Sequence, residues 1–255
     1  MAGGVLAVFA HPDDESILAG GVLAACAAAG HRVAIVSMTR GERGPTERPE
    51  LAGRLSLGEV REAELLAASN ALGVSTAECL DYPDGELADA DETQAARTIA
   101  LLLERERPEA VISFSDEGLY WHPDHLAVSR FVIAALDLLG GSALAALYGA
   151  TWPEGHAGRL VSLMRARGLT GDLWGIEPDA FGAPSDSITR SLDVRPFLPA
   201  KLAALRAYAS QIGPRHLLST LPDDLAEEFL GREYFVRIRP GESQRDWLAE
   251  ALRQA

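Results

Sequence analysis

The chain has 255 residues, 47% of them hydrophobic, which is enough for one large α/β domain with a substantial core. Its formal net charge of −14, from 23 basic and 37 acidic residues, argues against binding to nucleic acid or anionic membranes, which requires basic surfaces. Its two cysteines form no CxxC motif, and no apolar run reaches about 18 residues. No secretory leader is evident either, so we expect a cytoplasmic protein that is not embedded in a membrane.

The first 150 residues alternate strand-like apolar runs with helical patterns. The expected strands are 5–10, 32–39, 78–82, 109–114 and 143–150. The expected helices are 16–29, 55–72, 92–107 and 124–139, with loops at 40–54, 83–85 and 115–121. This alternation is typical of right-handed βαβ units. It predicts an α/β fold with a Rossmann-like, mostly parallel sheet flanked by helices.

The pattern becomes less regular after residue 150. Residues 152–171 mix Gly, Arg and short apolar runs, and residues 175–187 have the composition of a surface loop. Further on we expect strands at 187–194 and 234–238, a helix at 198–211 and an amphipathic tail at 243–255. Since no repeat or linker is visible, we predict a single domain over 1–255. Its core is 1–150, and 151–255 supplies C-terminal elements and shapes the substrate side of a cleft.

Two histidine-containing motifs follow expected strands. His-Pro-Asp-Asp-Glu occupies 11–15, and His-Pro-Asp-His occupies 122–125. The carboxyl ends of parallel strands share one edge of the sheet, where open α/β folds bind ligands. Two imidazoles and one carboxylate are a common zinc ligand set that leaves a position open for water.

Each motif alone also fits a structural histidine beside a helix N-cap, but the two together favour a metal site. There are four candidate side chains for a set of three protein ligands, so the residues themselves leave open which histidine has another role. They also leave Fe²⁺ or Mn²⁺ open as the ion. The candidates are His11, Asp14, His122 and His125.

The neighbouring acids suggest catalytic roles. Asp13 must point away from Asp14, so it can face a metal-activated water and accept its proton. Asp124 can orient His122 by accepting a hydrogen bond from its ring, or can simply cap a helix. An imidazolium at His122 would stabilise an oxyanion or protonate a leaving amine.

Four other residues are expected at the same edge, each with a structural alternative. Glu42 would either contact a ligand or be a solvated charge. Asp84 would either contact a ligand or belong to a turn. Arg61 binds substrate or pairs with Glu64 one helical turn away. Tyr120 polarises a carbonyl through its hydroxyl or packs.

The paired motifs resemble those of the LmbE-like (PIG-L) zinc-dependent de-N-acetylases. The likeness spans about residues 5–211 and is densest in the first 130. The supporting similarities are Thr39-Arg40-Gly41-Glu42, Arg61-Glu62-Ala63-Glu64, Tyr82-Pro83-Asp84-Gly85, Lys201 and Ser210-Gln211. One position departs from the pattern. Many relatives have a histidine where this chain has Tyr208, which puts the role of that helix in question.

The resemblance implies a role for each site residue. His11, Asp14 and His125 would bind the metal, and Asp13 would be the general base. His122, held by Asp124, would be the cationic or acid group, and Tyr120 would polarise the carbonyl. Glu42, Arg61 and Asp84 would contact the sugar.

We therefore expect a hydrolase that uses Zn²⁺, Fe²⁺ or another divalent ion to remove an N-acyl group, acetyl in the simplest case, from a small amino-sugar-like substrate. One alternative on the same core is an amidase of thiol S-conjugates or a deacetylase of glycosylated natural products. An alternative of another class is a non-catalytic metal-binding protein. The first strand is followed by no G-x-G-x-x-G turn, which argues against a nicotinamide cofactor. Homo-oligomerisation is left open.

Overall fold

One twisted sheet organises the protein. The computed structural model describes residues 4–46, 56–140, 145–214, 216–241 and 246–255. Within these residues seven strands form one sheet in the order β3-β2-β1-β4-β5-β7-β6. They are β1 (Gly4–Phe9), β2 (Arg32–Ser37), β3 (Thr76–Cys79), β4 (Ala110–Phe114), β5 (Ala146–Thr151), β6 (Arg190–Asp193) and β7 (Arg232–Arg239). The first five strands are parallel, whereas β7 runs antiparallel to both β5 and β6. The predicted Rossmann-like, mostly parallel sheet is confirmed.

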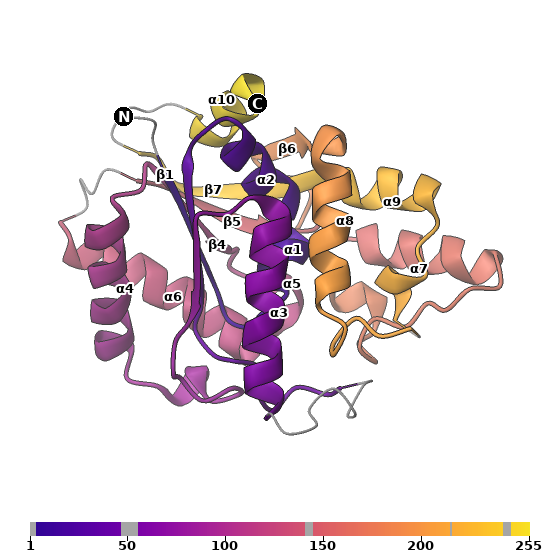
Figure 1. The fold of residues 1–255 in the computed structure, drawn as a ribbon, viewed down its shortest axis with the longest axis horizontal. Coiled ribbons are helices and arrows are strands. Elements are labelled where there is room, and N and C mark those ends of the chain that lie inside the picture. The colour runs from indigo at the N-terminus through magenta and orange to yellow at the C-terminus, as the bar shows by residue number, and fades with distance from the viewer. Residues whose placement is uncertain (1–3, 47–55, 141–144, 215, 242–245) are drawn as a thin grey trace.

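Helices cover both faces of this sheet. They are α1 (Asp14–Leu18), α2 (Gly20–Ala28), α3 (Leu57–Leu72), α4 (Glu92–Glu106), α5 (Gly118–Trp121), α6 (Pro123–Leu138), α7 (His156–Ala166), α8 (Leu198–Ala207), α9 (Asp223–Leu230) and α10 (Trp247–Gln254). Helix α4 packs on α6, and α3 packs on α8, so each face carries a helical layer. Figure 1 shows the first pair on the left, the second pair near the centre, and α7 with α9 on the right.

Local chemistry explains where these elements begin and end. Every residue of β1 is buried, as expected for a parallel strand covered on both faces. Helix α3 begins with a reciprocal capping box between Ser56 and Glu59 and ends at Gly73, which has a φ of 73°. Helix α6 begins at Pro123, whose missing N–H costs nothing in a first turn.

Several expected boundaries were wrong. The helix expected at 16–29 is broken at Ala19, β3 begins two residues before the expected 78, and α8 ends before the expected 211. The loop expected at 115–121 contains the short, distorted helix α5. Such shifts arise because tertiary contacts, and not only local patterns, decide where an element ends.

Two helices in the second half were not expected. Helix α7 lies in the mixed segment 152–171 and buries an apolar stripe that includes Leu160 and Met164. Helix α9 buries a similar stripe. The segment expected to be a surface loop at 175–187 instead buries Phe181 and Ala183. Gly and Arg obscured the helical periodicity. The packing of α9 on β7, and of α7 on α9 and the 3-10 turn at 178–180, supplied the stability that local propensity lacked.

Some expectations fall outside the described residues. They concern residues 47–54 of the expected loop 40–54 and Leu55, the first residue of the expected helix 55–72. They also concern residues 143–144 of the expected strand and residues 243–245 of the expected tail. The single-domain organisation stays a prediction. No helix in the described ranges combines the length and the apolar character needed to cross a bilayer.

Candidate metal and catalytic site

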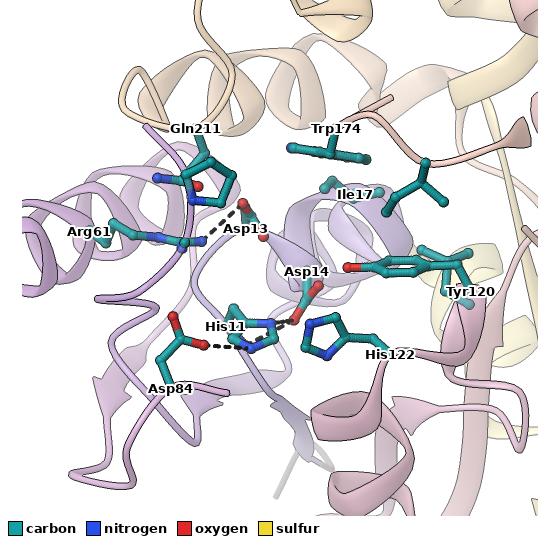
Figure 2. Close-up of a pocket in the computed structure, with 14 residues that line it drawn as sticks. His11, Asp13, Asp14, Ile17, Arg61, Asp84, Tyr120, His122, Trp174 and Gln211 are labelled. Atoms are coloured by element: carbon teal, nitrogen blue, oxygen red, sulfur yellow. Dashed lines mark hydrogen bonds and ion pairs between the residues drawn. The ribbon is translucent and has the colours of Figure 1, made fainter. Parts of the chain in front are cut away.

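The loops that follow β1, β2, β3 and β4 meet at one edge of the sheet, as the parallel topology requires. They line a cavity of about 240 Å³. Its lining includes polar or charged residues and one glycine, namely His11, Asp13, Asp14, Gly44, Arg61, Asp84, His122 and Gln211. The other lining residues are apolar or aromatic, namely Ile17, Pro45, Leu119, Tyr120, Trp174 and Ile176 (Figure 2). This is the cleft that the sequence predicted.

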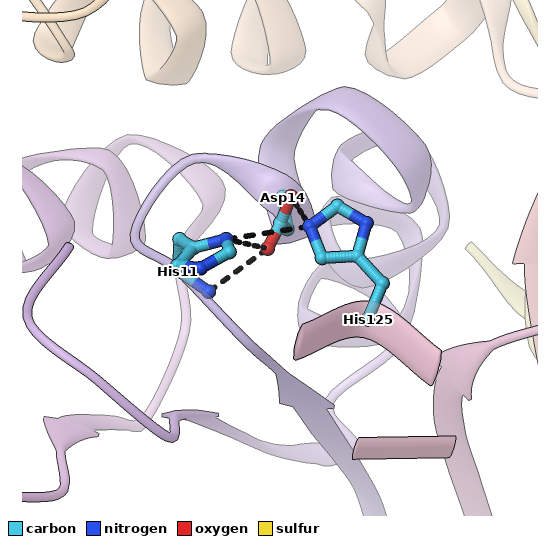
Figure 3. A group of neighbouring side chains, drawn as sticks. All are labelled: His11, Asp14 and His125. Atoms are coloured by element: carbon cyan, nitrogen blue, oxygen red, sulfur yellow. Dashed lines mark hydrogen bonds and ion pairs between the residues drawn. The ribbon is translucent and has the colours of Figure 1, made fainter. Parts of the chain in front are cut away.

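Three side chains at the base of the cavity have the geometry of a metal site (Figure 3). The distance between His11 Nδ1 and His125 Nε2 is 3.3 Å. The Asp14 carboxylate lies 3.5 Å from the first of these nitrogens and 3.4 Å from the second. Four ligands placed tetrahedrally at about 2.0–2.1 Å from zinc are about 3.3–3.4 Å apart. The three donors therefore have the spacing that one such ion requires.

The hydrogen bonds of the two imidazoles support the same conclusion. His125 Nδ1 lies 2.9 Å from the carbonyl oxygen of Gly118, which can only accept, so Nδ1 carries the proton. His11 Nε2 lies 3.1 Å from Asp84 and 3.3 Å from Asp124, so that nitrogen also carries a proton. The two remaining nitrogens face each other and Asp14. Burial opposes a charge on His11, but its hydrogen bonds to Asp124, Asp14 and Asp84 outweigh burial and raise its pKa well above the usual value, so a proton lies between these groups. A divalent metal would take the place of that proton, and the donor set fits such an ion.

Burial alone would raise the pKa of Asp14, but His125 and His11 outweigh burial and hold that pKa well below its usual range. Asp14 is therefore ionised at neutral pH. An ionised carboxylate is the form that binds a metal.

The Asp124 carboxylate differs from expectation. It accepts from His11 Nε2 and from the backbone N–H groups of Gly85 and Leu87, at 2.8 and 3.0 Å. The expected bond from the His122 ring to this carboxylate is replaced by one from the Asp124 backbone N–H to His122 Nδ1, at 3.2 Å. Asp124 thus orients a candidate metal ligand, because the chain folds the Asp84 turn against the start of α6.

His122 differs in its charge as well. Burial and the nearby His11 lower its pKa, which favours the neutral ring. Since its Nδ1 accepts a hydrogen bond, the proton of the neutral ring is on Nε2. His122 lines the cavity, so it is a neutral donor there rather than the expected imidazolium.

Asp13 has an unusual backbone and a tightly held carboxylate. Its φ is 119°, a region that few residues other than glycine adopt. One carboxylate oxygen lies 3.1 Å from Arg61 Nη2, and among the described residues the other accepts no hydrogen bond. Burial raises the pKa of Asp13 to about 8, against the opposing effect of Arg61. A buried carboxylate with a raised pKa is suited to accepting a proton.

Arg61 joins the first two loops of the site. It donates to the carbonyl of Gly41 at 2.8 Å and to that of Pro12 at 2.6 Å, besides its contact with Asp13. A Cβ atom at Gly41 would lie 2.3 Å from the guanidinium, so only glycine fits there. The alternative pair with Glu64 is not formed, because Glu64 accepts from Ser210 instead.

The C-terminal end of α8 also reaches the site, which answers the question raised by Tyr208. Its hydroxyl is fully buried and donates to Glu15 at 2.6 Å. Glu15 in turn accepts from the backbone N–H of Asp13 at 3.2 Å. Gln211, a few residues further, lines the cavity.

The remaining expected contacts divide between the cavity and its surroundings. Asp84 lines the cavity, and its pKa is about 2 because His11 outweighs the effect of burial. Tyr120 directs its hydroxyl toward Asp14 in Figure 2. Glu42 is exposed and does not line the cavity, and it accepts from the backbone N–H of Asp84 at 2.9 Å. It therefore supports the turn that carries Asp84.

Sequence reasoning missed the apolar wall of the cavity. Trp174 and Ile176 come from the segment before the short 3-10 turn at 178–180, and Leu119 and Ile17 come from α5 and α1. No motif signals these residues, because only the folded chain brings them beside the metal ligands. The general expectation that part of 151–255 would face the cleft agrees with this position.

Together, the fold and the site define an α/β protein with a candidate mononuclear metal centre at the carboxyl edge of its sheet. The chain belongs to the PIG-L family, described as GlcNAc-PI de-N-acetylase, whose family model matches residues 6–136. This is a family of deacetylase enzymes.

Similar proteins support this assignment over nearly the whole chain. A 1D-myo-inositol 2-acetamido-2-deoxy-alpha-D-glucopyranoside deacetylase from Thermomonospora curvata is 34% identical, with 92% of this chain and 90% of the relative covered. The protein with the same description from Acidothermus cellulolyticus is also 34% identical, with coverages of 94% and 90%. The crystal structure of a conserved protein from Thermus thermophilus superposes with a TM-score of 0.64 at 27% identity, covering 93% and 95% of the two chains.

Proposed function

We propose that this protein is a metal-dependent N-deacetylase of a small amino-sugar substrate, with Zn²⁺ as the first candidate ion and Fe²⁺ as the second. The observation that carries the proposal is the triangle of two imidazole nitrogens and one carboxylate at the base of an open cavity. His11, Asp14 and His125 would hold the ion. When bound, such an ion lowers the pKa of a water molecule and polarises a carbonyl group.

The surrounding residues supply the remaining chemistry. Asp13 accepts the proton of the attacking water through the oxygen that Arg61 leaves free. His122 donates from Nε2, and Tyr120 from its hydroxyl, to the carbonyl oxygen as negative charge develops there. The C–N bond then breaks, the amine takes up a proton within the site, and acetate and the free amino sugar leave. Asp84 and Gln211 are placed to contact sugar hydroxyls.

The relatives guide the choice of substrate. The two described above are named as deacetylases of an N-acetylglucosamine joined to inositol. The open cavity of about 240 Å³ holds roughly one sugar ring with its acetamide group, so any further group on the sugar would extend out of it. We therefore propose that the substrate is a single N-acetylated amino-sugar unit, either free or linked to a polar aglycone.

Acetate release from N-acetylglucosaminyl inositol and from simple N-acetylglucosaminides tests this proposal. We expect release to stop on chelation and to return when Zn²⁺ or Fe²⁺ is added back. Longer acids released from S-conjugates, or from acylated glycosides, would instead favour the amidase or natural-product alternatives. Bound metal with no hydrolysis across this panel would overturn the proposal in favour of a non-catalytic metal-binding protein.

The role of Asp13 is tested by Asp13→Asn. We expect metal content to be retained and kcat to fall by about 10²–10⁴-fold, because the carboxylate that takes the proton is lost. Asp116→Asn is the matched control, because Asp116 is an exposed aspartate just beyond β4 that does not line the cavity. A normal rate in Asp13→Asn would refute the assignment of the base.

A further inference from the structure

Trp174 occupies a turn that is unfavourable for its residue type. Its φ is 54° and that of Gly175 is 71°, and the backbone N–H of Ile176 donates to the carbonyl of Leu173 at 2.9 Å. Two consecutive positive φ values across such a bond are typical of a type I′ turn, in which Gly, Asn and Asp predominate. A bulky residue with positive φ is strained, so a tryptophan here needs a compensating interaction.

The surrounding contacts fix this turn in place. Asp172 accepts from the Gly175 backbone N–H at 3.0 Å through its side chain, and from that of Leu217 at 3.3 Å through its carbonyl. The side chain of Leu173 is buried, and the Trp174 ring packs against that of His216 with centroids 4.4 Å apart. These contacts join the turn to the segment around His216 and hold the indole against that ring.

This arrangement places the indole on the wall of the catalytic cavity. Figure 2 shows Trp174 across the cavity from His11 and His122, beyond Asp13 and Asp14. Ile17 lies near Trp174 in Figure 2, and Ile176 also lines the cavity. The polar groups on the facing side, Asp84 among them, can bind hydroxyls, whereas the face of the indole offers apolar surface and its N–H lies at the ring edge. A pyranose ring has the same asymmetry, because its C–H groups gather on its faces and its hydroxyls project from its rim.

We propose that Trp174 is a specificity-determining residue that packs against the C–H face of the sugar ring bearing the N-acyl group. This inference rests on the proposed deacetylase function and deepens it, since it selects cyclic amino sugars over acyclic N-acyl amines. The apolar contact with the indole stabilises the bound ring and leaves the chemistry at the metal unchanged. A role in substrate binding would explain why a tryptophan occupies this strained position.

Steady-state kinetics with two substrates test the proposal. In Trp174→Asn, whose new residue suits a type I′ turn, we expect KM for methyl N-acetylglucosaminide to rise roughly tenfold, from the loss of apolar contact, with kcat nearly unchanged. The kcat/KM for acyclic N-acetylethanolamine should stay the same. Trp174→Phe should restore most of the affinity for the sugar. Equal losses on both substrates, or no loss on either, would overturn the proposal.

A binding measurement separates this inference from the proposed function. We expect methyl N-acetylglucosaminide to change the tryptophan fluorescence of the chelated, inactive protein. The change should disappear in Trp174→Phe and persist in Trp121→Phe, a matched control whose tryptophan also has a positive φ but does not line the cavity. An unchanged signal in Trp174→Phe would contradict the inference even if deacetylation is found. Failure of the wild-type protein to release acetate from any sugar would instead contradict the function.

Discussion

Asp13 shows how single residues at this site are held against their preferences. Its positive φ is maintained by its carbonyl, which accepts from the backbone N–H groups of Ser16 and Ile17, each at 3.0 Å. Its own N–H donates to Glu15, and its carboxylate contacts Arg61. Non-glycine residues in such conformations persist only where their surroundings fix them, and they gather at functional sites. Here the conformation turns Asp13 and Asp14 in different directions.

Tyr208 reaches Asp13 through Glu15, so it is a positioning residue. We expect Tyr208→Phe to lower kcat roughly tenfold, because a buried carboxylate loses one of its donors and holds the Asp13 backbone less firmly. KM and metal content should change little. Steady-state kinetics on the metal-loaded protein give both constants.

Tyr148→Phe is the control for this variant. Tyr148 is also a buried tyrosine with a bonded hydroxyl, but its partners Asp246 and Trp247 lie near α10 and not at the cavity. We expect it to lose some stability and to keep its kcat. An equal loss of kcat in the two variants would mean that Tyr208 acts only through general stability.

At the scale of elements, a buried ion pair ties the C-terminal strands to the first half of the fold. Lys201 of α8 lies 2.6 Å from Glu233 of β7, and both side chains are at most 2% exposed. Glu233 also accepts from the backbone N–H groups of Gly21 and Val22 at the start of α2. A Cβ atom at Gly21 would lie 2.5 Å from Val194, so this approach requires glycine.

Glu233→Gln tests this connection. We expect the free energy of unfolding to fall by about 3 kcal/mol or more, because Lys201 is left charged and unpaired in the interior. The double variant Glu233→Gln/Lys201→Met should recover part of that loss. Urea unfolding of the three proteins measures both effects, and a double variant no more stable than the single one would contradict the unpaired-charge explanation.

His156, the first residue of α7, makes the stability of the protein depend on pH. Burial lowers its pKa to about 4, despite the hydrogen bond of its ring to the carbonyl of Phe229. Because the pKa in the unfolded chain is about 6.5, the unfolded state binds more protons between pH 6.5 and 4. This contribution to stability is complete above pH 6.5 and is lost as the pH falls toward 4.

We expect the metal-free protein to lose on the order of 3 kcal/mol from this group over that interval, with about 2 kcal/mol of it already lost at pH 5. His156→Gln keeps a donor for the carbonyl but does not titrate, so its stability should depend less on pH. Urea unfolding at pH 7.5 and 5 compares the two proteins. Parallel losses in both would show that other groups cause the acid sensitivity.

At the scale of the whole molecule, the candidate metal centre joins parts of the chain that are far apart in sequence. His11 and Asp14 follow β1, whereas His125 lies in α6, which comes after β4 in the chain. A ligand that binds only the folded protein stabilises it, by about 2.7 kcal/mol at one hundred times its dissociation constant. We expect Zn²⁺ to raise the melting temperature and His125→Ala to abolish that rise. An equal rise in both proteins would mean that the ion binds elsewhere.

The sequence was informative wherever function and local pattern coincide. The parallel strands were predictable because buried apolar runs alternate with amphipathic helices, and that alternation permits few topologies. The meeting of the two histidine motifs was predictable because strands of such a sheet end at one edge, whereas the choice of His11, Asp14 and His125 as the ligands came from the family resemblance. The antiparallel β6 and β7, and helices α7 and α9, were less predictable, since their stability comes from packing and not from local propensity.

By itself, then, the sequence determined the chemistry that the site can offer, because residue types and their distance from strand ends are local properties. The tertiary structure decided which atoms meet. It turned Asp124 toward His11, gave His122 a neutral ring, took Glu42 out of the cavity and placed Trp174 on its wall. These outcomes depend on contacts between segments, some of them more than one hundred residues apart, and such contacts exist only once the core has packed and fixed each loop against its neighbours.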